Sequence, residues 1–345
     1  MSVDMTRSRE LSAAIVEGVR GRGRILIVCH DNPDPDSLAS ACALKHLLLI
    51  KTGQEATITF GGIIGRGENR AMVRELEINV IPFAKIRPDD YTVVCMVDTQ
   101  PGTGNNSWPV ERPVDLVIDH HPLRPTTSDC RFSDVRVGFG ACATILFQYL
   151  LAQEVSVNTK LATIIYYAIK SETQELGREG GAADRAAYLS LAQLCNNRIL
   201  YRITHPKRAR AYFGVFNRAL ENARIYDSLL VFNLYNIDNP DTVAEMADFL
   251  LAAEGIKTVF GMGCYRDEIL LSIRSSCHDV GVGEVIRKVA AGYGTAGGHA
   301  MIAGGQIPVT RRSQKHQKEL ERIFTRRLID ALELKARRGK RLVEV

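Results

Sequence analysis

The sequence lacks any segment that could serve as a signal peptide or cross a membrane. Charged side chains occur throughout the first thirty residues, and no later apolar run is long enough to span a bilayer. The eight cysteines include no CxxC pair, and Cys29 and Cys95 lie in apolar, strand-like runs, as expected of buried free thiols in a reducing compartment. Repeats of 20 to 50 residues and low-complexity regions are also absent. These absences favour a cytoplasmic protein with no membrane partner.

What the chain contains is ordinary globular material: 345 residues, 46% hydrophobic and 24% charged, enough for two domains with separate cores. The net charge of +5 is uneven, because residues 311–345 hold 12 Lys and Arg against 5 Asp and Glu. A basic tail could contact nucleic acid or an anionic substrate. However, a helical apolar stripe also runs through it, formed by Leu320, Ile323, Phe324, Leu328 and Leu332. The favoured interpretation is a terminal helix, packed or forming a homodimer, with a solvated basic face.

From about residue 25 the chain alternates apolar strand patterns with helical patterns, which is typical of an α/β fold with a mostly parallel sheet covered by helices. Strands are predicted over residues 24–29, 56–60, 91–97 and 115–118, and helices over 37–51, 68–76, 142–152, 159–171 and 184–195. We expect one domain over residues 20–195.

A polar helical stretch over residues 196–227 is interpreted as connector helices. A second block follows, with strands predicted over 228–235, 258–262 and 268–273, a helix over 241–255, and a glycine-rich segment that ends at Gly305. This predicts a smaller α/β domain over residues 228–312 and a basic C-terminal helix over 313–345.

The sharpest local signal runs from His30 to Ser40, where the first predicted strand ends and a helix begins. Ligands bind at the carboxyl ends of strands in open α/β sheets. Asp34 and Asp36 flank one proline, and as positions i and i+2 of an extended run they would project to the same side. Two such carboxylates can each bind one of two metals about 3.5 to 4 Å apart. The alternative is turn chemistry with an aspartate as helix N-cap.

Two further apolar strands end in the same way. One runs into Asp98, and the other into Asp119, His120 and His121. Three such strand ends at one sheet edge predict a dinuclear site. Carboxylates with imidazoles and no thiolate suit Mn²⁺, and less securely Mg²⁺ or Zn²⁺. A metal pair would activate water for attack on phosphorus, so the expected chemistry is phosphoester or phosphoanhydride hydrolysis.

With the run Asp119-His120-His121, the chain resembles the DHH phosphoesterases over nearly its whole length after residue 20. The resemblance implies two metals per chain. By resemblance the ligands of one metal are His30, Asp34 and Asp98, and those of the second are Asp36, Asp98 and His120. His121 would contact the substrate phosphate or the leaving group, and Asp119 would orient its neighbours.

The family's fourth motif usually supplies one more aspartate, and the matching stretch of this chain has Glu172. Glutamate keeps the charge but is one methylene longer. We expect Glu172 to bind the second metal; the alternative is a solvated glutamate at a helix end.

In the second domain, Arg274 and Ser275 lie at a predicted strand end, and a glycine-rich segment contains Gly298 and His299. A guanidinium and backbone amides can close around phosphate, although glycine clusters are as often turns. The pattern resembles the DHH-associated C-terminal domain, except for Ala296 in the first glycine position. The resemblance implies that Arg274, Ser275, Gly298 and His299 form the substrate side of a cleft between the domains.

Within the family, this length and domain content resemble the oligoribonuclease and 3'-phosphoadenosine-5'-phosphate phosphatase group, and residues 61–70 also resemble exopolyphosphatase-related members. The leading hypothesis is a Mn²⁺-dependent hydrolase of short RNA, linear dinucleotides or nucleoside bisphosphates. One alternative is a pyrophosphatase or exopolyphosphatase, which should grip phosphate with more Lys and Arg than Arg274. Another is a non-catalytic nucleotide sensor in which Glu172 weakens the second metal.

Overall fold

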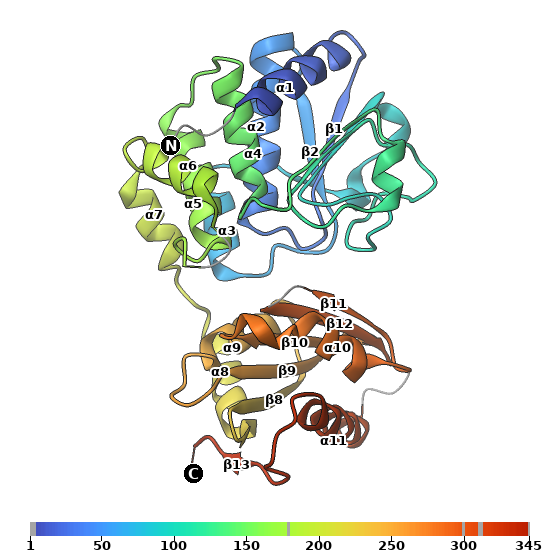
Figure 1. Ribbon diagram of the computed structural model, residues 1–345, viewed down its shortest axis with the longest axis vertical. Coiled ribbons are helices and arrows are strands. Elements are labelled where there is room, and N and C mark those ends of the chain that lie inside the picture. The colour runs from blue at the N-terminus through green and yellow to red at the C-terminus, as the bar shows by residue number, and fades with distance from the viewer. Residues whose placement is uncertain (1–4, 178–179, 299–300, 310–312, 344–345) are drawn as a thin grey trace. The chain divides into compact units, whose positions relative to one another are not determined.

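The computed structural model describes residues 5–177, 180–298, 301–309 and 313–343, and the chain forms two compact units (Figure 1). The first unit comprises Met1–Pro206 and the second Lys207–Val345. None of the helices in the described residues combines the length and the apolar character that a membrane span requires. All eight cysteines are free thiols, and Cys29 and Cys95 are buried.

A six-stranded parallel sheet forms the centre of the N-terminal unit, in the order β3-β2-β1-β4-β5-β6. Its central strands are apolar on both faces, as parallel strands between two layers must be. The predicted α/β class with a mostly parallel sheet is therefore confirmed. The strands are β1 (Ile25–Val28), β2 (Ala56–Phe60), β3 (Ile81–Pro82), β4 (Val93–Val97), β5 (Leu116–Asp119) and β6 (Phe132–Val135).

Helices cover one face of this sheet. Ile25 and Ile27 of β1 lie in the large core beneath these helices, whereas Leu26 and Val28 point to the other face and pack with Trp108. The helices of the unit are α1 (Thr6–Val19), α2 (Pro35–Thr52), α3 (Gly67–Glu75), α4 (Cys142–Ala152), α5 (Thr159–Glu172), α6 (Ala182–Ala192) and α7 (Asn197–Thr204). Short 3-10 turns are η1 (Phe83–Lys85), η2 (Pro88–Asp90) and η3 (Pro125–Asp129). Helix α1 has no counterpart in the sequence prediction.

The start of α2 differs from the prediction of an extended run through Asp34 and Asp36. The helix begins at Pro35, because proline at the first helical position needs no N–H partner and already has a helical φ. Asp34 is the N-cap, and its Oδ1 accepts hydrogen bonds from the backbone N–H groups of Asp36 and Ser37. Asp36 therefore lies in the first helical turn, and the extended geometry was wrong.

The C-terminal unit is built on a seven-stranded mixed sheet in the order β11-β12-β10-β9-β8-β7-β13. Only β8 and β9 pair in parallel among the described strands. The strands are β7 (Arg224–Tyr226), β8 (Leu229–Asn236), β9 (Thr258–Tyr265), β10 (Glu268–Ser275), β11 (Thr295–Gly298), β12 (Ile302–Pro308) and β13 (Lys340–Arg341). The helices are α8 (Arg210–Asn222), α9 (Thr242–Leu250), α10 (Val282–Ala290) and α11 (Gln314–Ala331), with the turn η4 (His278–Val280).

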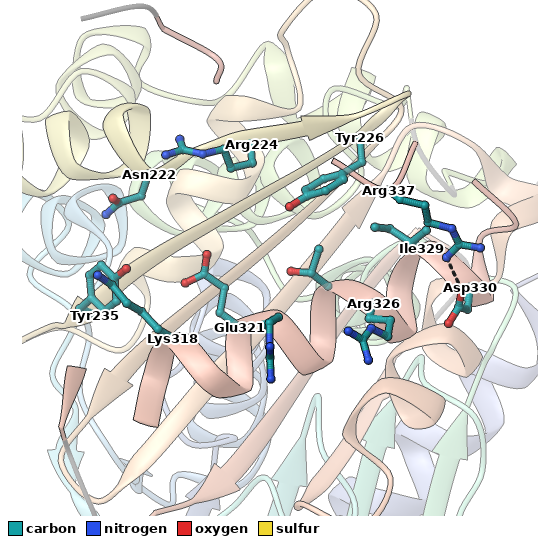
Figure 2. Close-up of a pocket in the computed structure, with 12 residues that line it drawn as sticks. Asn222, Arg224, Tyr226, Tyr235, Lys318, Glu321, Arg326, Ile329, Asp330 and Arg337 are labelled. Carbon is teal, nitrogen blue, oxygen red and sulfur yellow. Dashed lines mark hydrogen bonds and ion pairs between the residues drawn. The ribbon is translucent and has the colours of Figure 1, made fainter. Parts of the chain in front are cut away.

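Helices α10 and α11 pack on one face of the second sheet, and α8 and α9 pack on the other. Leu320, Phe324 and Leu328 of α11 are buried in the first of these cores, which confirms the predicted packing of the apolar stripe. A neighbouring side of α11 borders a groove of about 920 Å³ beside β7 and β8 (Figure 2).

Candidate metal centre

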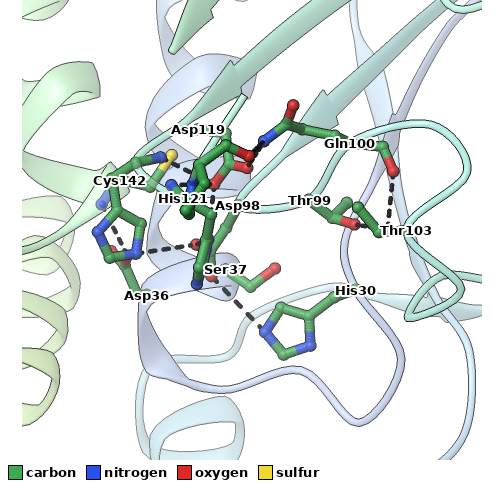
Figure 3. A network of polar contacts seen from close by, with 12 residues as sticks. His30, Asp36, Ser37, Asp98, Thr99, Gln100, Thr103, Asp119, His121 and Cys142 are labelled. Atoms are coloured by element: carbon green, nitrogen blue, oxygen red, sulfur yellow. Dashed lines mark hydrogen bonds and ion pairs between the residues drawn. The ribbon is translucent and has the colours of Figure 1, made fainter. Parts of the chain in front are cut away.

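Three adjacent strands of the first sheet end beside one another. β1 and β5 flank β4, and parallel strands place their carboxyl ends at the same sheet edge. His30 lies two residues beyond β1, Asp98 directly follows β4, and His120 directly follows β5. The side chains that the sequence singled out at these strand ends therefore meet at one place (Figure 3).

Asp98 lies at the centre of this cluster. Its Oδ2 is 3.6 Å from Nε2 of His30, and its Oδ1 is 3.4 Å from Nε2 of His120. The Asp98 backbone has a φ of 58°, a conformation that costs energy for a non-glycine residue and that is common at functional sites. Its Oδ1 is buried and accepts no hydrogen bond from the described residues. A buried anionic oxygen without a donor is costly unless a cation balances it.

The two histidines facing Asp98 are oriented in the same way. Nδ1 of His30 lies 2.9 Å from the carbonyl oxygen of Asp31, and Nδ1 of His120 lies 3.0 Å from that of Phe139. If each Nδ1 carries the proton and donates to its carbonyl, the Nε2 lone pair is left to face the carboxylates. This is the orientation that metal-binding histidines usually have.

Asp34 divides its two oxygens between two tasks. Oδ1 caps α2, whereas Oδ2 lies 3.6 Å from Nε2 of His30. Ligand atoms of His30, Asp34 and Asp98 lie within 4.8 Å of one another, close enough to hold one ion. The N-cap role and a ligand role of Asp34 are thus compatible.

Asp36 connects α2 to the first turn of α4. Its Oδ2 accepts a hydrogen bond of 2.7 Å from the backbone N–H of Cys142, and its Oδ1 accepts one of 2.8 Å from Ala143. The same Oδ2 lies 3.8 Å from Nε2 of His120. Burial and the charge of Asp98 raise the pKa of Asp36 well above its ordinary value. Each oxygen still has a lone pair for a cation.

Asp119 orients the two histidines that follow it. Its Oδ1 accepts a hydrogen bond from the backbone N–H of His120 at 2.8 Å and lies 2.8 Å from Nδ1 of His121. The Nδ1 of His121 is also 3.6 Å from Oδ1 of Asp98, so Asp98, His120 and His121 form a second group within 4.8 Å. Burial lowers the pKa of His121, but its hydrogen bond with Asp119 and the negative charges of Asp98 and Asp119 together raise it above its ordinary value.

Gln100 was missed by the sequence analysis. Its Nε2 donates a hydrogen bond of 2.7 Å to Oδ2 of Asp119, and its Oε1 accepts from the backbone N–H of Arg124 and from Oγ1 of Thr127. The side chain is fully buried. The available signal was its position two residues beyond Asp98, where the polar run that follows an apolar strand continues.

Glu172, the last residue of α5, is half-buried beside the cluster. Burial and then the negative charge of Asp34 raise its pKa to about 7 from an ordinary 4.5. The charges of His120 and His121 act in the opposite direction but do not cancel this rise. The glutamate at the fourth-motif position is therefore within electrostatic reach of the predicted metal ligands.

The charge balance of the cluster fits divalent cations. Four aspartates and one glutamate converge with three histidines, namely Asp34, Asp36, Asp98, Asp119, Glu172, His30, His120 and His121. Burial lowers the pKa of His30, yet the carboxylates of Asp34 and Asp98 raise it to about 10. The unpartnered oxygen of Asp98 and the oxygen and nitrogen donors around it suit hard or borderline cations such as Mn²⁺ or Mg²⁺.

The predicted substrate residues lie in the second unit. Arg274 of β10 pairs with Ile302 of β12, and the next residue of β12, Ala303, pairs with Gly298 of β11, so Arg274 and Gly298 share one end of the sheet. His299 lies outside the described residues. Arg274 and Ser275 are both buried.

The polar groups of Arg274 and Ser275 already have partners within this unit. Nε of Arg274 donates to Oδ1 of Asp248 at 2.6 Å, and its Nη1 donates to the carbonyl oxygen of Ile273. Oγ of Ser275 donates to the carbonyl oxygen of Lys257 and accepts from the backbone N–H of Cys277. Asp248 thus fixes the direction of the guanidinium.

Two family models match the chain. The DHH family, N-terminal domain, matches residues 24–169, and the DHHA1 domain matches residues 227–326, so together they cover more than two thirds of the sequence. An uncharacterised protein of Methanocaldococcus jannaschii, MJ1633, is 36% identical over 287 residues, which is 83% of this chain and 58% of that protein. The chain thus spans about three fifths of the length of this relative.

Solved structures share the fold at low sequence identity. An exopolyphosphatase-related protein from Bacteroides fragilis superposes with a TM-score of 0.74 at 14% identity, over 95% of this chain and 97% of that one. RecJ from Thermus thermophilus in complex with Mn²⁺ superposes with a TM-score of 0.54 at 13% identity, over 97% of this chain and 56% of RecJ. With both domain models matched in order, the chain belongs to the DHH family.

Proposed function

We propose that this protein is a metal-dependent phosphoesterase that hydrolyses short oligoribonucleotides, linear dinucleotides or nucleoside 3',5'-bisphosphates. The observation that carries the proposal is Asp98, whose two oxygens face His30 and His120 and whose buried Oδ1 has no donor among the described residues. Membership of the DHH family supports phosphate-ester hydrolysis as the reaction class.

His30, Asp34 and Asp98 would hold one cation. Asp36, Asp98 and His120 would hold a second, with Glu172 as a further ligand. Mn²⁺ suits this mixture of carboxylate and imidazole donors, and Mn²⁺ is the ion in the RecJ complex of the same fold. When bound, the two cations would lower the pKa of a water molecule and neutralise the phosphate oxygens.

The chain's own residues would orient and bind the scissile phosphate. Asp119 holds Nδ1 of His121, and the raised pKa of His121 favours the imidazolium, which donates hydrogen bonds from both nitrogens. His121 is therefore suited to donate to a phosphate oxygen or to the departing oxygen. Gln100 fixes Asp119 and thereby limits the rotation of His121.

Substrate choice would depend on the C-terminal unit. We assign Arg274, Ser275, Gly298 and His299 to the recognition of a phosphate at the substrate's end, with Asp248 orienting Arg274. A single arginine with backbone amides suits one terminal phosphate better than a chain of phosphates. This supports nucleotide substrates over polyphosphate.

A substrate panel in Mn²⁺ tests the proposal. Labelled dinucleotides, RNA of twelve nucleotides, cyclic dinucleotides, a nucleoside 3',5'-bisphosphate and pyrophosphate are offered to wild-type protein and to Asp98→Asn. We expect cleavage of dinucleotides or the bisphosphate by the wild type alone. Turnover of pyrophosphate only would replace the proposal with a phosphoanhydride hydrolase. Nucleotide binding without turnover, unchanged in Glu172→Asp, would identify a sensor.

A further inference from the structure

The groove beside α11 is strongly cationic. Its lining contains more basic side chains than acidic ones, and it lies entirely within the C-terminal unit (Figure 2). All the predicted metal ligands belong to the other unit. The groove is therefore a separate feature, and its role is independent of the proposed function.

One wall of the groove is a row of cations on α11. Lys318, Arg322 and Arg326 follow one another at intervals of four residues, so they project from the same side of the helix. All three are exposed, and none forms an ion pair within the described residues. Successive members are separated by about 6 Å along the helix axis, so the row extends over about 12 Å. That length exceeds what one phosphate group occupies.

The acidic residues of the groove neutralise this row only in part. Asp330 is paired with Arg337, and Glu321 accepts a hydrogen bond of 2.9 Å from Nδ2 of Asn233. Burial raises the pKa of Glu321, while this hydrogen bond and the charges of Arg224 and Lys318 oppose the rise. Glu321 is therefore a partial counter-charge for Lys318, whereas no ion pair joins either acid to Arg322 or Arg326 within the described residues.

The opposite wall adds positive charge in an unfavourable arrangement. Arg224 of β7 lies directly across from Arg341 of β13 in an antiparallel pair. Like charges at directly opposed positions destabilise a sheet unless another group balances them. Nη1 of Arg224 is held by the carbonyl oxygens of Glu221 and Ala223, so its position is fixed rather than free to retreat into solvent. Glu321 attracts Arg224, and an anionic ligand would offset the repulsion further.

Two half-buried tyrosines line the same groove, Tyr226 of β7 and Tyr235 of β8. Tyr235 has a φ of 54° at a register irregularity between β8 and β9, and its backbone N–H donates a hydrogen bond to Oδ1 of Asn233. A left-handed backbone is costly for a bulky residue, and strand irregularities of this kind redirect side chains. Here the strained residue lines the cationic groove, as Figure 2 shows.

We propose that this groove binds single-stranded nucleic acid, with phosphates along Lys318, Arg322 and Arg326 and a base against Tyr235. Cations in a row track a phosphate backbone, and aromatic rings provide stacking surfaces that accept any base. An acidic protein segment would match the charge of the groove, but its carboxylate side chains would not stack on the tyrosine rings. The length of the row suits a strand of a few nucleotides.

The test measures binding of a fluorescein-labelled oligouridylate of twelve nucleotides to the full-length protein by fluorescence anisotropy, in EDTA so that no cleavage occurs. We expect Arg322→Glu/Arg326→Glu to weaken binding at least tenfold and to lower the slope of log K against log salt by about 1.4, or 0.7 for each phosphate contact. The matched control is Arg287→Glu/Lys288→Glu on α10, which makes the same charge change at exposed residues of the same unit. The control should bind within about twofold of wild type. Equal weakening by the two double variants would overturn the proposal, because only bulk charge would be involved.

A second variant separates nucleic acid from an acidic peptide. Tyr235→Asn removes the ring, and asparagine tolerates the left-handed backbone. We expect it to weaken oligouridylate binding at least fivefold while leaving binding of an oligoglutamate of equal charge unchanged. If oligoglutamate binds wild type as tightly as the RNA and Tyr235→Asn affects neither, the groove is a site for acidic protein and the proposal fails.

Discussion

Gln100 donates a hydrogen bond of 2.7 Å to Oδ2 of Asp119, which makes a residue outside the predicted ligand set the anchor of the DHH run. Gln100→Leu would leave the carboxylate of Asp119, the backbone N–H of Arg124 and the hydroxyl of Thr127 without this partner. We expect a loss of about 1–3 kcal/mol of unfolding free energy. Mn²⁺ affinity or turnover should fall about 10- to 100-fold, as for other residues that orient metal ligands.

Isothermal titration with Mn²⁺ and urea unfolding measure these effects. The matched control is Gln148→Leu, since Gln148 is also buried, and its side chain is hydrogen-bonded to Ser8 and Arg136 rather than to a predicted metal ligand. The Gln148→Leu variant should lose stability but keep its affinity for Mn²⁺. Unchanged Mn²⁺ affinity and turnover in Gln100→Leu would contradict the proposal that Gln100 anchors Asp119.

Asp98→Asn should lower turnover strongly while changing the stability of the metal-free protein little. Asparagine has the same shape, but it removes a charge shared by both proposed metals, so turnover should fall more than about 100-fold, beyond the usual effect of an orienting residue. Without metal the variant should stay close to wild type in stability, because losing the charge of Asp98 relieves its repulsion of Asp36 but also removes its attraction to His30 and His120. Asp115→Asn, at the opposite end of β5, is the control and should keep its turnover. Substantial turnover by Asp98→Asn would argue against the dinuclear site.

Glu172 should make the metal-free protein less stable as pH rises. Its folded pKa is raised to about 7 from 4.5, so between these values the folded state retains a proton that the unfolded state has lost. Stability therefore falls across this window, and above pH 7 Glu172→Gln should be more stable than wild type by up to about 3 kcal/mol.

Urea unfolding in EDTA from pH 4.5 to 8 measures the difference, with Glu55→Gln, at an exposed residue, as the control. Added Mn²⁺ should reverse the order, since the carboxylate then has a cation to bind. A pH-independent difference between wild type and Glu172→Gln would show that the carboxylate does not sense the cluster.

Metal affinity should increase with pH. Burial lowers the pKa of His30, but Asp34 and Asp98 raise it to about 10, so a metal that binds Nε2 must displace a proton throughout the neutral range. We expect up to about a tenfold gain in Mn²⁺ affinity per pH unit for this one proton. Titration calorimetry in two buffers of different ionisation enthalpy counts the protons released. His46 of α2, whose Nε2 lies 3.1 Å from the carbonyl oxygen of Ser156, is the control. His46→Gln should release as many protons as wild type, whereas His30→Gln should release fewer.

The sequence predicted the strands around the site closely, because β1, β4 and β5 are apolar runs that end abruptly in polar residues. The sequence also predicted that Asp98 and His120 lie at one sheet edge, because the carboxyl ends of neighbouring parallel strands lie at the same edge. The local geometry of Asp34 and Asp36 was predicted wrongly, because proline was taken to exclude a helix that it in fact begins.

Other features depend on tertiary contacts that sequence spacing does not encode. The contact between Gln100 and Asp119 joins two strand ends, and the ion pair between Arg274 and Asp248 joins a strand to a helix. Neither Gln100 nor Asp248 has a distinctive sequence neighbourhood. The strained backbone of Tyr235 could not be predicted from the sequence either, because it arises from the pairing of β8 with β9 rather than from the residue itself.

The carboxylate of Asp36 links the predicted metal site to the backbone of α4. It holds the backbone N–H groups of Cys142 and Ala143, at the start of a helix that belongs to the main core of the unit. A cation bound to Asp36 would draw electron density from the same oxygens and lengthen these two hydrogen bonds. The chemical shifts of the amide protons of Cys142 and Ala143 should therefore change when a metal binds. NMR with a diamagnetic ion such as Mg²⁺ can measure metal occupancy in this way without any substrate.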